Sequence, residues 1–361
     1  MSSMPQQPTQ AELYFTSDNV AGACAAVLDA LVACAAGPAA PYGADPWTAS
    51  VERRLAALFE HEVAVFVVPT GTAANALALA ALTPPWGSVL CHPGSHVNND
   101  ECGAPAFYAD GIKLVTVDGP DAKLDPVRLR AAAWAKRGDV HTTQPSAVSL
   151  TQATETGGVY TLAEIGAIAE VCREAGLPLH MDGARFANAL VSLGCSPAEL
   201  TWRAGVDALS FGATKNGVPG AEAIVLFDTR RAAELAFRRK RAGLLASKMR
   251  FQAAQLDAYL ADDLWLRNAR HANAMAQRLA GGLRALPGVA IAGSVDANIL
   301  FCTLPQPVIT GLLAGGVHFY HDRWAPGVVR FVTSFATTLD EVDRLVSLAS
   351  ALANALPHAR P

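Results

Sequence analysis

The sequence predicts an α/β protein with a mostly parallel sheet sandwiched by helices. Short, nearly continuous apolar runs alternate with segments of helical period, a pattern typical of parallel strands that are buried on both faces. Hydrophobic residues make up 51% of the 361 residues and charged residues only 17%, against a usual charged share of about 25%. This composition allows a large buried core and favours an oligomer.

Seven apolar runs are the predicted strands of this sheet, and helical segments lie between several of them. The strands are expected at 62–68, 89–91, 112–117, 147–151, 177–181, 206–211 and 223–227. The helices of this part are expected at 72–82, 126–136 and 162–175. In an open sheet of this kind ligands bind beyond the carboxyl ends of the strands, so polar residues that directly follow a strand are functional candidates.

The chain changes character after residue 230. Long helices are expected over 230–284, followed by strands at 298–303, 318–321 and 328–333 and a helix from Asp340. We therefore divide the chain into an N-terminal lead (1–15), a large domain (16–255) and a small C-terminal α+β domain (256–361). The first ten residues are polar and contain two prolines and three glutamines, so the lead is expected to be disordered or extended.

Charge and motif content exclude several classes of protein. The net charge of −4 argues against a nucleic-acid partner, which usually needs a basic domain. No apolar run reaches the 18 residues that suggest a membrane span, and the N-terminus lacks the features of a signal peptide. The seven cysteines are scattered without a C-x-x-C pair, which predicts reduced thiols and a cytoplasmic location. The histidines and cysteines show no zinc spacing, so no metal is expected.

A candidate phosphate site follows the first strand. The segment 69–75, PTGTAAN, joins this strand to a helix. Free N–H groups at a helix N-terminus suit a phosphate group, Gly71 allows close backbone approach, and Thr72 adds a hydroxyl. The alternative is an ordinary capped turn without a ligand.

Asp182 and Lys215 follow two later strands. An ionised Asp182 in the segment HMDGAR could keep a pyridine nitrogen protonated, an arrangement known for pyridoxal 5'-phosphate (PLP); the alternative is a helix cap. Lys215, one of six lysines, lies in a small loop after a buried strand, where desolvation favours the neutral amine that attacks an aldehyde. The alternative is a surface lysine. The phosphate turn, the aspartate and the lysine together predict PLP binding.

The order of these motifs and their residues resemble the low-specificity L-threonine aldolase family, a group of fold-type I PLP enzymes, and in particular its bacterial subgroup. The similar stretches run through most of the chain: 16–19, 42–45, 70–75, His96, 180–185, 214–217, 248–250 and 329–331, with DECGAP at 100–105 and PAELTWR at 197–203. The resemblance implies the PLP fold type I, with a seven-stranded sheet and a small C-terminal domain. It also implies a homotetramer built as a dimer of dimers, with sites at the dimer interface.

The resemblance also implies a role for individual residues. Lys215 would bond covalently to the cofactor, Asp182 would pair with its pyridine nitrogen, and His96 would stack on its ring and act as a base. The phosphate would be held by Gly71 and Thr72, and the substrate carboxylate by Ser17, Arg185 and Arg330, with Arg185 also beside the cofactor. Tyr42, Lys240 and Arg250 would reach the cofactor or the site entrance from a neighbouring subunit.

The implied activity is that of a lyase that splits L-threonine, L-allo-threonine and related β-hydroxy-α-amino acids into glycine and an aldehyde. The alternatives on the same scaffold are a phenylserine aldolase or another PLP-dependent lyase or transaldolase. A non-catalytic PLP-fold binding protein would lack the lysine or the carboxylate clamp, and both are present. A nucleotide-binding protein would carry G-x-G-x-x-G or a P-loop, and the sequence has neither.

The sequence departs from the family at two places. Glu155 stands where many members have a second histidine, so the base that takes the β-hydroxyl proton is His96, Glu155 or a bound water. Glu155 is accordingly counted among the substrate-site residues. Asn98 and Asn99 stand in the His96 loop where at least one acidic residue is expected, which suggests a different preference for the substrate side chain.

Overall fold

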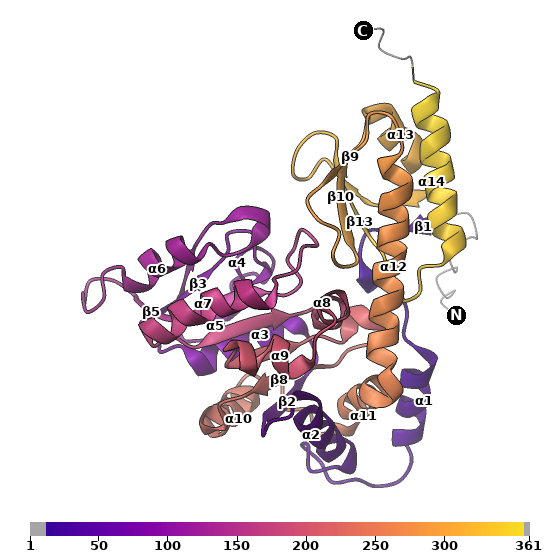
Figure 1. Ribbon diagram of the computed structural model, residues 1–361. Coiled ribbons are helices and arrows are strands. Elements are labelled where there is room, and N and C mark those ends of the chain that lie inside the picture. Colours follow the sequence, from indigo (N-terminus) through magenta and orange to yellow (C-terminus); the bar gives the residue numbers. More distant parts are fainter. Residues whose placement is uncertain (1–11, 357–361) are drawn as a thin grey trace.

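The computed structural model describes residues 12–356 (Figure 1). Residues 1–11 of the predicted N-terminal lead (1–15) lie outside this part. Within it, residues Leu13–Tyr14 form a short strand, β1, that pairs in parallel with β11 (Val317–His318). The predicted division of the chain at 255/256 stays a prediction.

A seven-stranded sheet forms the centre of the larger part, as predicted. Its order is β2 (Ala64–Val68), β8 (Glu222–Leu226), β7 (Ala208–Phe211), β6 (Leu179–Gly183), β5 (Gln144–Thr151), β3 (Gly87–Cys91) and β4 (Lys113–Thr116). Only β8 runs against its neighbours. Because β8 is reversed, its first residue lies at the same sheet edge as the carboxyl ends of the parallel strands.

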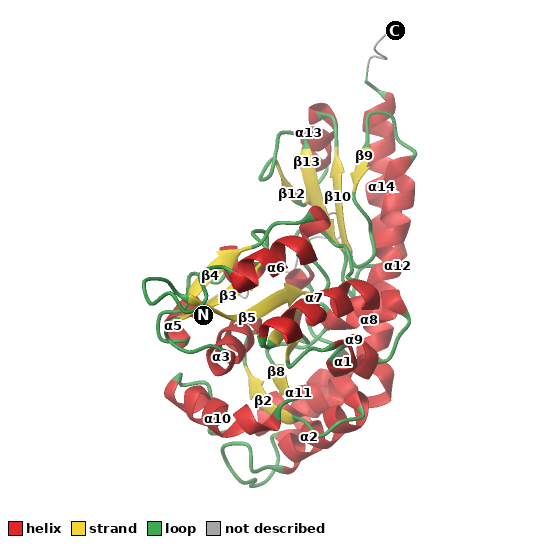
Figure 2. Ribbon diagram, turned by 60° about the vertical axis from the view of Figure 1, so that its left-hand side comes forward, coloured by secondary structure: helices red, strands yellow, loops and turns green. Residues whose placement is uncertain are grey.

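Helices cover both faces of this sheet (Figure 2). Side chains alternate along β2, so that Val67 joins one core while Phe66 and Val68 join the other. The Val67 face packs against α1 (Ala25–Cys34), α2 (Pro46–Phe59), α6 (Pro126–Trp134), α7 (Leu162–Ala175), α8 (Phe186–Leu193) and α11 (Arg250–Leu260). The other face packs against α3 (Gly71–Leu82) and α10 (Ala232–Arg241). Burial on both faces explains why the strands are apolar throughout.

A second, smaller sheet lies beside the long helix α12 (Leu264–Arg284) (Figure 1). Its antiparallel order is β12 (Tyr320–His321), β13 (Val328–Val332), β10 (Ile299–Thr303) and β9 (Ala290–Ala292). Helices α12, α13 (Gln306–Ala314) and α14 (Leu339–Asn354) enclose a separate core with it. Phe15 belongs to this core, so the residue that follows β1 packs against the smaller sheet and its helices. Nowhere in residues 12–356 is there a helix with the length and apolar character to cross a membrane.

Candidate active site

A cavity of about 340 Å³ opens at the carboxyl edge of the large sheet. Its walls come from the segments that follow β2, β6 and β7, from the start of α4 (His96–Asn99) and from the first residue of β8. Five of the residues proposed from the sequence line it: Gly71, Thr72, His96, Asp182 and Lys215. The strand ends therefore bring the phosphate turn, the aspartate and the lysine to one place.

The N-terminus of α3 forms one wall of the cavity. The Thr70 side chain caps this helix, since its Oγ1 accepts the Ala73 N–H at 3.1 Å. The N–H groups of Gly71 and Thr72 precede the first intrahelical hydrogen bond and remain available to a ligand. A Cβ added at Gly71 would meet nothing within 4 Å, so the backbone there is open to the cavity. This wall suits an anion, because the helix dipole places positive charge at this end.

Asp182 lies buried at the end of β6. Its Oδ1 accepts the Ala184 N–H at 3.0 Å, and its Oδ2 accepts an N–H of the Asn75 side chain at 2.9 Å. The following helix, α8, begins only at Phe186, with Arg185 at its N-cap. The alternative interpretation of Asp182 as a helix cap is therefore wrong, and its carboxylate faces the cavity.

A buried carboxylate supports His96 from behind. His96 Nδ1 lies 2.8 Å from Glu101 Oε1, which also accepts an N–H from Asn75 at 2.8 Å. The hydrogen bond to Glu101 raises the pKa of His96 above its ordinary value. Burial in turn raises the pKa of Glu101. Asn75 thus connects the carboxylate behind His96 with the carboxylate of Asp182.

Replacing Glu101 by glutamine is expected to lower the pKa of His96 by about one unit, because an anionic hydrogen-bond partner becomes neutral. The measurement is an NMR titration of the histidine ring signals. Asp322→Asn is the matched control, since Asp322 Oδ2 forms the same kind of contact with His321 Nδ1 at 2.7 Å on the surface. A His96 midpoint that is the same in Glu101→Gln and in the wild-type protein would contradict the assigned role of Glu101.

Lys215 lies half-buried in a 3₁₀ turn, Thr214–Asn216, directly after β7. The Asn216 side chain holds this turn in place by donating to the Tyr259 hydroxyl at 2.7 Å and to the Trp265 carbonyl at 2.8 Å. The turn is therefore anchored to the helices behind it. Lys215 lines the cavity, and its assignment as the residue that bonds to the cofactor stays a prediction.

Arg185 is held by a carboxylate that the sequence analysis missed. Its Nε and Nη2 donate to Asp18 Oδ2 and Oδ1 at 2.8 and 3.0 Å, and the two side chains are 6% and 1% exposed. Asn298 donates a further hydrogen bond to Asp18 at 3.1 Å. Burial opposes the charge of Asp18, but the positive charges of Arg185 and Lys215 prevail and lower its pKa. Ser17 caps the short turn that begins at Asp18.

Arg330 approaches the same region from β13. Its Nη2 donates to the Thr16 carbonyl at 3.2 Å, and its guanidinium lies 4.8 Å from the centre of the Tyr320 ring. Burial and the nearby charge of Arg185 lower the pKa of Arg330. The negative charge of Glu155, in contrast, acts to raise the pKa of both arginines. Arg185, Arg330 and Glu155 therefore lie within electrostatic range of one another.

Tyr42, Lys240 and Arg250 lie apart from this cavity. Lys240 Nζ is 4.9 Å from the centre of the Tyr42 ring, and Arg250 Nη1 donates to the Gly37 carbonyl at 2.8 Å. Within the described part of the chain, none of the three is among the residues that line the cavity. Their expected contribution from a neighbouring subunit stays a prediction.

Four polar residues of the site were not proposed from the sequence: Asn75, Glu101, Asp18 and Glu222. Asn75 follows Gly71 by one helical turn, so its position in the TGTAAN motif was a usable signal. Glu101 supplies the carboxylate that was expected in the His96 loop, whereas Asn98 and Asn99 both donate to the Pro93 carbonyl. Asp18 lies in the stretch 16–19 that resembles the family, which was a usable signal, whereas Glu222 carried none.

Comparison with known proteins agrees with this arrangement. A family model described as beta-eliminating lyase matches residues 14–305. A low-specificity L-threonine aldolase of Pseudomonas aeruginosa is 47% identical over 92% of this chain and 95% of its own length. One from another Pseudomonas strain is 44% identical over 92% of this chain and 96% of its own.

A solved structure gives the same result for the fold. The threonine aldolase of Leishmania major, 29% identical, superposes with a TM-score of 0.89 over 94% of this chain and 99% of that one. The matches to both Pseudomonas enzymes and to this structure span nearly the whole chain. The chain therefore belongs to the beta-eliminating lyase family and, within it, to the low-specificity L-threonine aldolases.

Proposed function

We propose that this chain is a PLP-dependent aldehyde-lyase that cleaves L-threonine, L-allo-threonine and related β-hydroxy-α-amino acids to glycine and an aldehyde. The observation that carries the proposal is one cavity lined by a helix N-terminus, a buried aspartate and a lysine. The 47% identity to a low-specificity L-threonine aldolase over 92% of the chain supports it.

The residues present fit PLP. The phosphate would lie at the open backbone of Gly71 and Thr72, and the ring nitrogen would face Asp182. Among residues 12–356, the buried Asn75 Oδ1 has no hydrogen-bond partner and belongs to a residue that lines this cavity. Buried polar atoms are normally paired, so this oxygen is expected to bind a ligand. When bound, PLP supplies an electron sink for the bond that breaks.

The chain's own residues would bind and orient the amino acid. Arg185 keeps one guanidinium nitrogen, Nη1, outside its contact with Asp18, and we assign it with Arg330 to the substrate carboxylate. Because a guanidinium grips a carboxylate in a planar geometry, this contact would fix the rotation of the substrate. Positioning of this kind contributes several kcal/mol, out of the roughly 7–11 available from full orientation.

We assign the removal of the β-hydroxyl proton to His96 rather than to Glu155. Glu101 holds His96 at Nδ1, so Nε2 is the nitrogen left to accept a proton. Glu155 instead lies near Arg185 and Arg330 and is not among the described residues that line the cavity. Glu155 itself and a bound water stay the alternatives for this base.

The proposal includes a cytoplasmic homotetramer, a dimer of dimers in which sites lie at the dimer interface. Phe107 and Phe237, which are 78% and 79% exposed, line one groove together with Lys240. Exposed aromatic side chains on a shared surface are typical of subunit contacts. The cysteines of the chain are free thiols, which supports the location.

The test is a product analysis with L-threonine and L-allo-threonine as substrates. We expect glycine and acetaldehyde in equal amounts, detected by chromatography and by an aldehyde-coupled assay. 2-Oxobutanoate and ammonia would instead identify an eliminating lyase, as the name of the matching family model allows. Phenylserine, compared at equal concentration, would identify a phenylserine aldolase if its kcat/KM exceeded that of both threonines by roughly 100-fold, a difference that one pocket can produce.

A further inference from the structure

Glu222 is a buried carboxylate at the cavity, and it is assigned to neither cofactor binding nor substrate binding. It is the first residue of β8 and pairs in register with Val68, the last residue of β2. Because β8 is antiparallel, Glu222 lies at the carboxyl edge of the sheet together with Asp182 and Lys215. It is 5% exposed and lines the cavity with both of them.

The carboxylate of Glu222 binds the backbone that carries Lys215. Its Oε2 accepts the Ala213 N–H at 2.6 Å, and its Oε1 accepts the Thr214 N–H at 3.4 Å. These two residues directly precede Lys215. The strand β8 therefore fixes the start of the lysine turn, while Asn216 fixes its end.

The surroundings of Glu222 contain few charges. Lys215 faces it from the turn after β7, the Tyr259 hydroxyl from α11, and Asp182 lines the same cavity from β6. From β2 its register partner is the apolar Val68. Burial is the main influence and raises the pKa of Glu222 to about 7, although Lys215 acts against this rise. A buried glutamate is costly unless it is paired; the Ala213 and Thr214 N–H groups bind it, and the charge of Lys215 acts on it.

We propose that Glu222 is a positioning residue for Lys215, which holds the backbone of the lysine turn and sets a negative charge in the cavity that Lys215 also lines. The proposal rests on the assignment of Lys215 as the residue that bonds to PLP. A neutral acceptor would suffice for the two N–H groups. A carboxylate additionally favours the protonated form of the Lys215 nitrogen in its bond to the cofactor.

The test compares Glu222→Gln with the wild-type enzyme, both loaded with PLP. Glutamine keeps the shape and one acceptor oxygen but removes the charge. The readout is the pH titration of the visible absorbance band of the bound cofactor, which reports protonation of the nitrogen of Lys215. We expect the midpoint to fall by about one pH unit or more, because loss of a nearby negative charge disfavours the cation.

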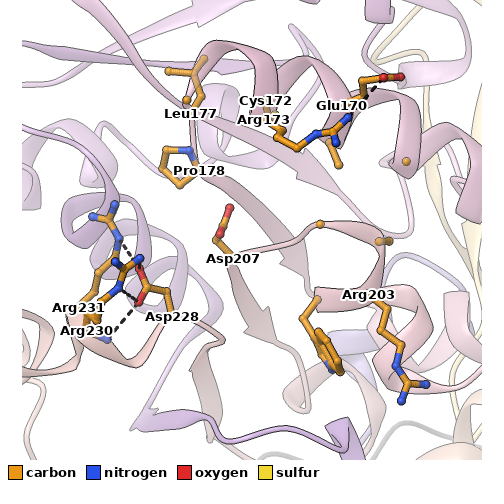
Figure 3. Close-up of a pocket in the computed structure, with 16 residues that line it drawn as sticks. Glu170, Cys172, Arg173, Leu177, Pro178, Arg203, Asp207, Asp228, Arg230 and Arg231 are labelled. Atoms are coloured by element: carbon orange, nitrogen blue, oxygen red, sulfur yellow. Dashed lines mark hydrogen bonds and ion pairs between the residues drawn. The ribbon is translucent and has the colours of Figure 1, made fainter.

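Asp207→Asn is the matched control. Asp207 is also a carboxylate next to a strand, half-buried directly before β7, and its Oδ2 accepts the Leu179 N–H at 2.8 Å. Burial raises its pKa as well. It lies in a groove at the opposite edge of the sheet, close to the Asp228, Arg230 and Arg231 cluster (Figure 3). Its replacement should leave the midpoint of the band unchanged.

Each result decides the proposal. A lower midpoint in Glu222→Gln, with Asp207→Asn at the wild-type value, would support it. Equal midpoints in Glu222→Gln and wild type would overturn it, even if Glu222→Ala lowered the melting temperature, because the role would then be structural only. If the wild-type enzyme showed no visible band with PLP, both the proposed function and this inference would be wrong. If the wild-type band were normal and the midpoint in Glu222→Gln were the same, only the inference would be wrong.

Discussion

Replacing Lys215 by alanine is expected to reduce turnover by roughly 10³-fold or more, a loss typical for removal of a covalent catalytic group. Lys215 is the one lysine among the residues that line the described cavity. Its turn is held at both ends by buried hydrogen bonds, so removal of the side chain should leave the fold intact. The first measurement is cleavage of L-threonine under saturating PLP.

The bond between Lys215 and PLP can be detected independently of turnover. Borohydride reduces the C=N bond between an amine and bound PLP to a stable single bond. Peptide mass spectrometry of the reduced wild-type enzyme should therefore find the cofactor on Lys215, and the Lys215→Ala variant should carry none. Lys113→Ala is the control, because Lys113 is an exposed residue of the edge strand β4. A cofactor label on another lysine of the wild-type enzyme would contradict the assignment.

The architecture of the sheet could be predicted from the sequence because parallel strands buried on both faces are apolar throughout. Each of the seven predicted strands is present, although several bounds shift by a few residues. Helices α1 and α2 were not predicted. α1 has no side-chain cap and contains only two buried residues, Val27 and Cys34, so it lacks the periodic apolar stripe. α2 did carry a signal, since Asp45 caps it before Pro46.

The residues at strand ends could be placed together because parallel strands end at one edge of a sheet. This reasoning located Asp182 and Lys215 in one cavity. It could not locate their supporting carboxylates, since these act across long separations in the chain. Asp18 meets Arg185 over 167 residues. Glu222 lies at the same edge only because β8 is antiparallel, and strand direction has no local signature in the sequence.

The buried pair of Asp18 and Arg185 should dominate the stability of the region between the two sheets. Replacing Asp18 by asparagine removes the charge and leaves the Arg185 guanidinium buried without its counter-ion. Loss of one partner of such a pair costs about 3–5 kcal/mol. We expect a decrease of this size in the free energy of unfolding, measured by urea titration of the PLP-free proteins at pH 7.

The surface pair of Arg278 and Asp343 provides the control for this prediction. Its geometry is the same, with Nε and Nη2 donating to the two carboxylate oxygens at 2.6 and 2.7 Å, but both side chains are half exposed. Asp343→Asn should therefore change the stability little, because water screens exposed pairs. Equal effects of Asp18→Asn and Asp343→Asn would show that burial of the first pair does not matter.

The pH dependence of stability also tests the pair of Asp18 and Arg185, because acid protonates Asp18 and removes its charge. The pKa of Asp18 lies below its ordinary value of 3.8 in the folded chain, so its contribution is complete above that value. The contribution is lost as the pH falls through the lowered folded-state pKa, because the folded state then takes up the proton. The difference in stability between wild type and Asp18→Asn should accordingly be constant from pH 6 to 8, within roughly 0.5 kcal/mol. It should shrink under strongly acidic conditions.

The same substitution should also weaken substrate binding. Asp18 holds two of the three guanidinium nitrogens of Arg185, and without it the arginine loses its fixed orientation. If Arg185 binds the substrate carboxylate as proposed, the KM for L-threonine rises more than kcat falls, because a contact made before and during the reaction is lost. An unchanged KM in a folded, PLP-loaded Asp18→Asn enzyme would remove Arg185 from the substrate site and leave its pair with Asp18 as a purely structural contact.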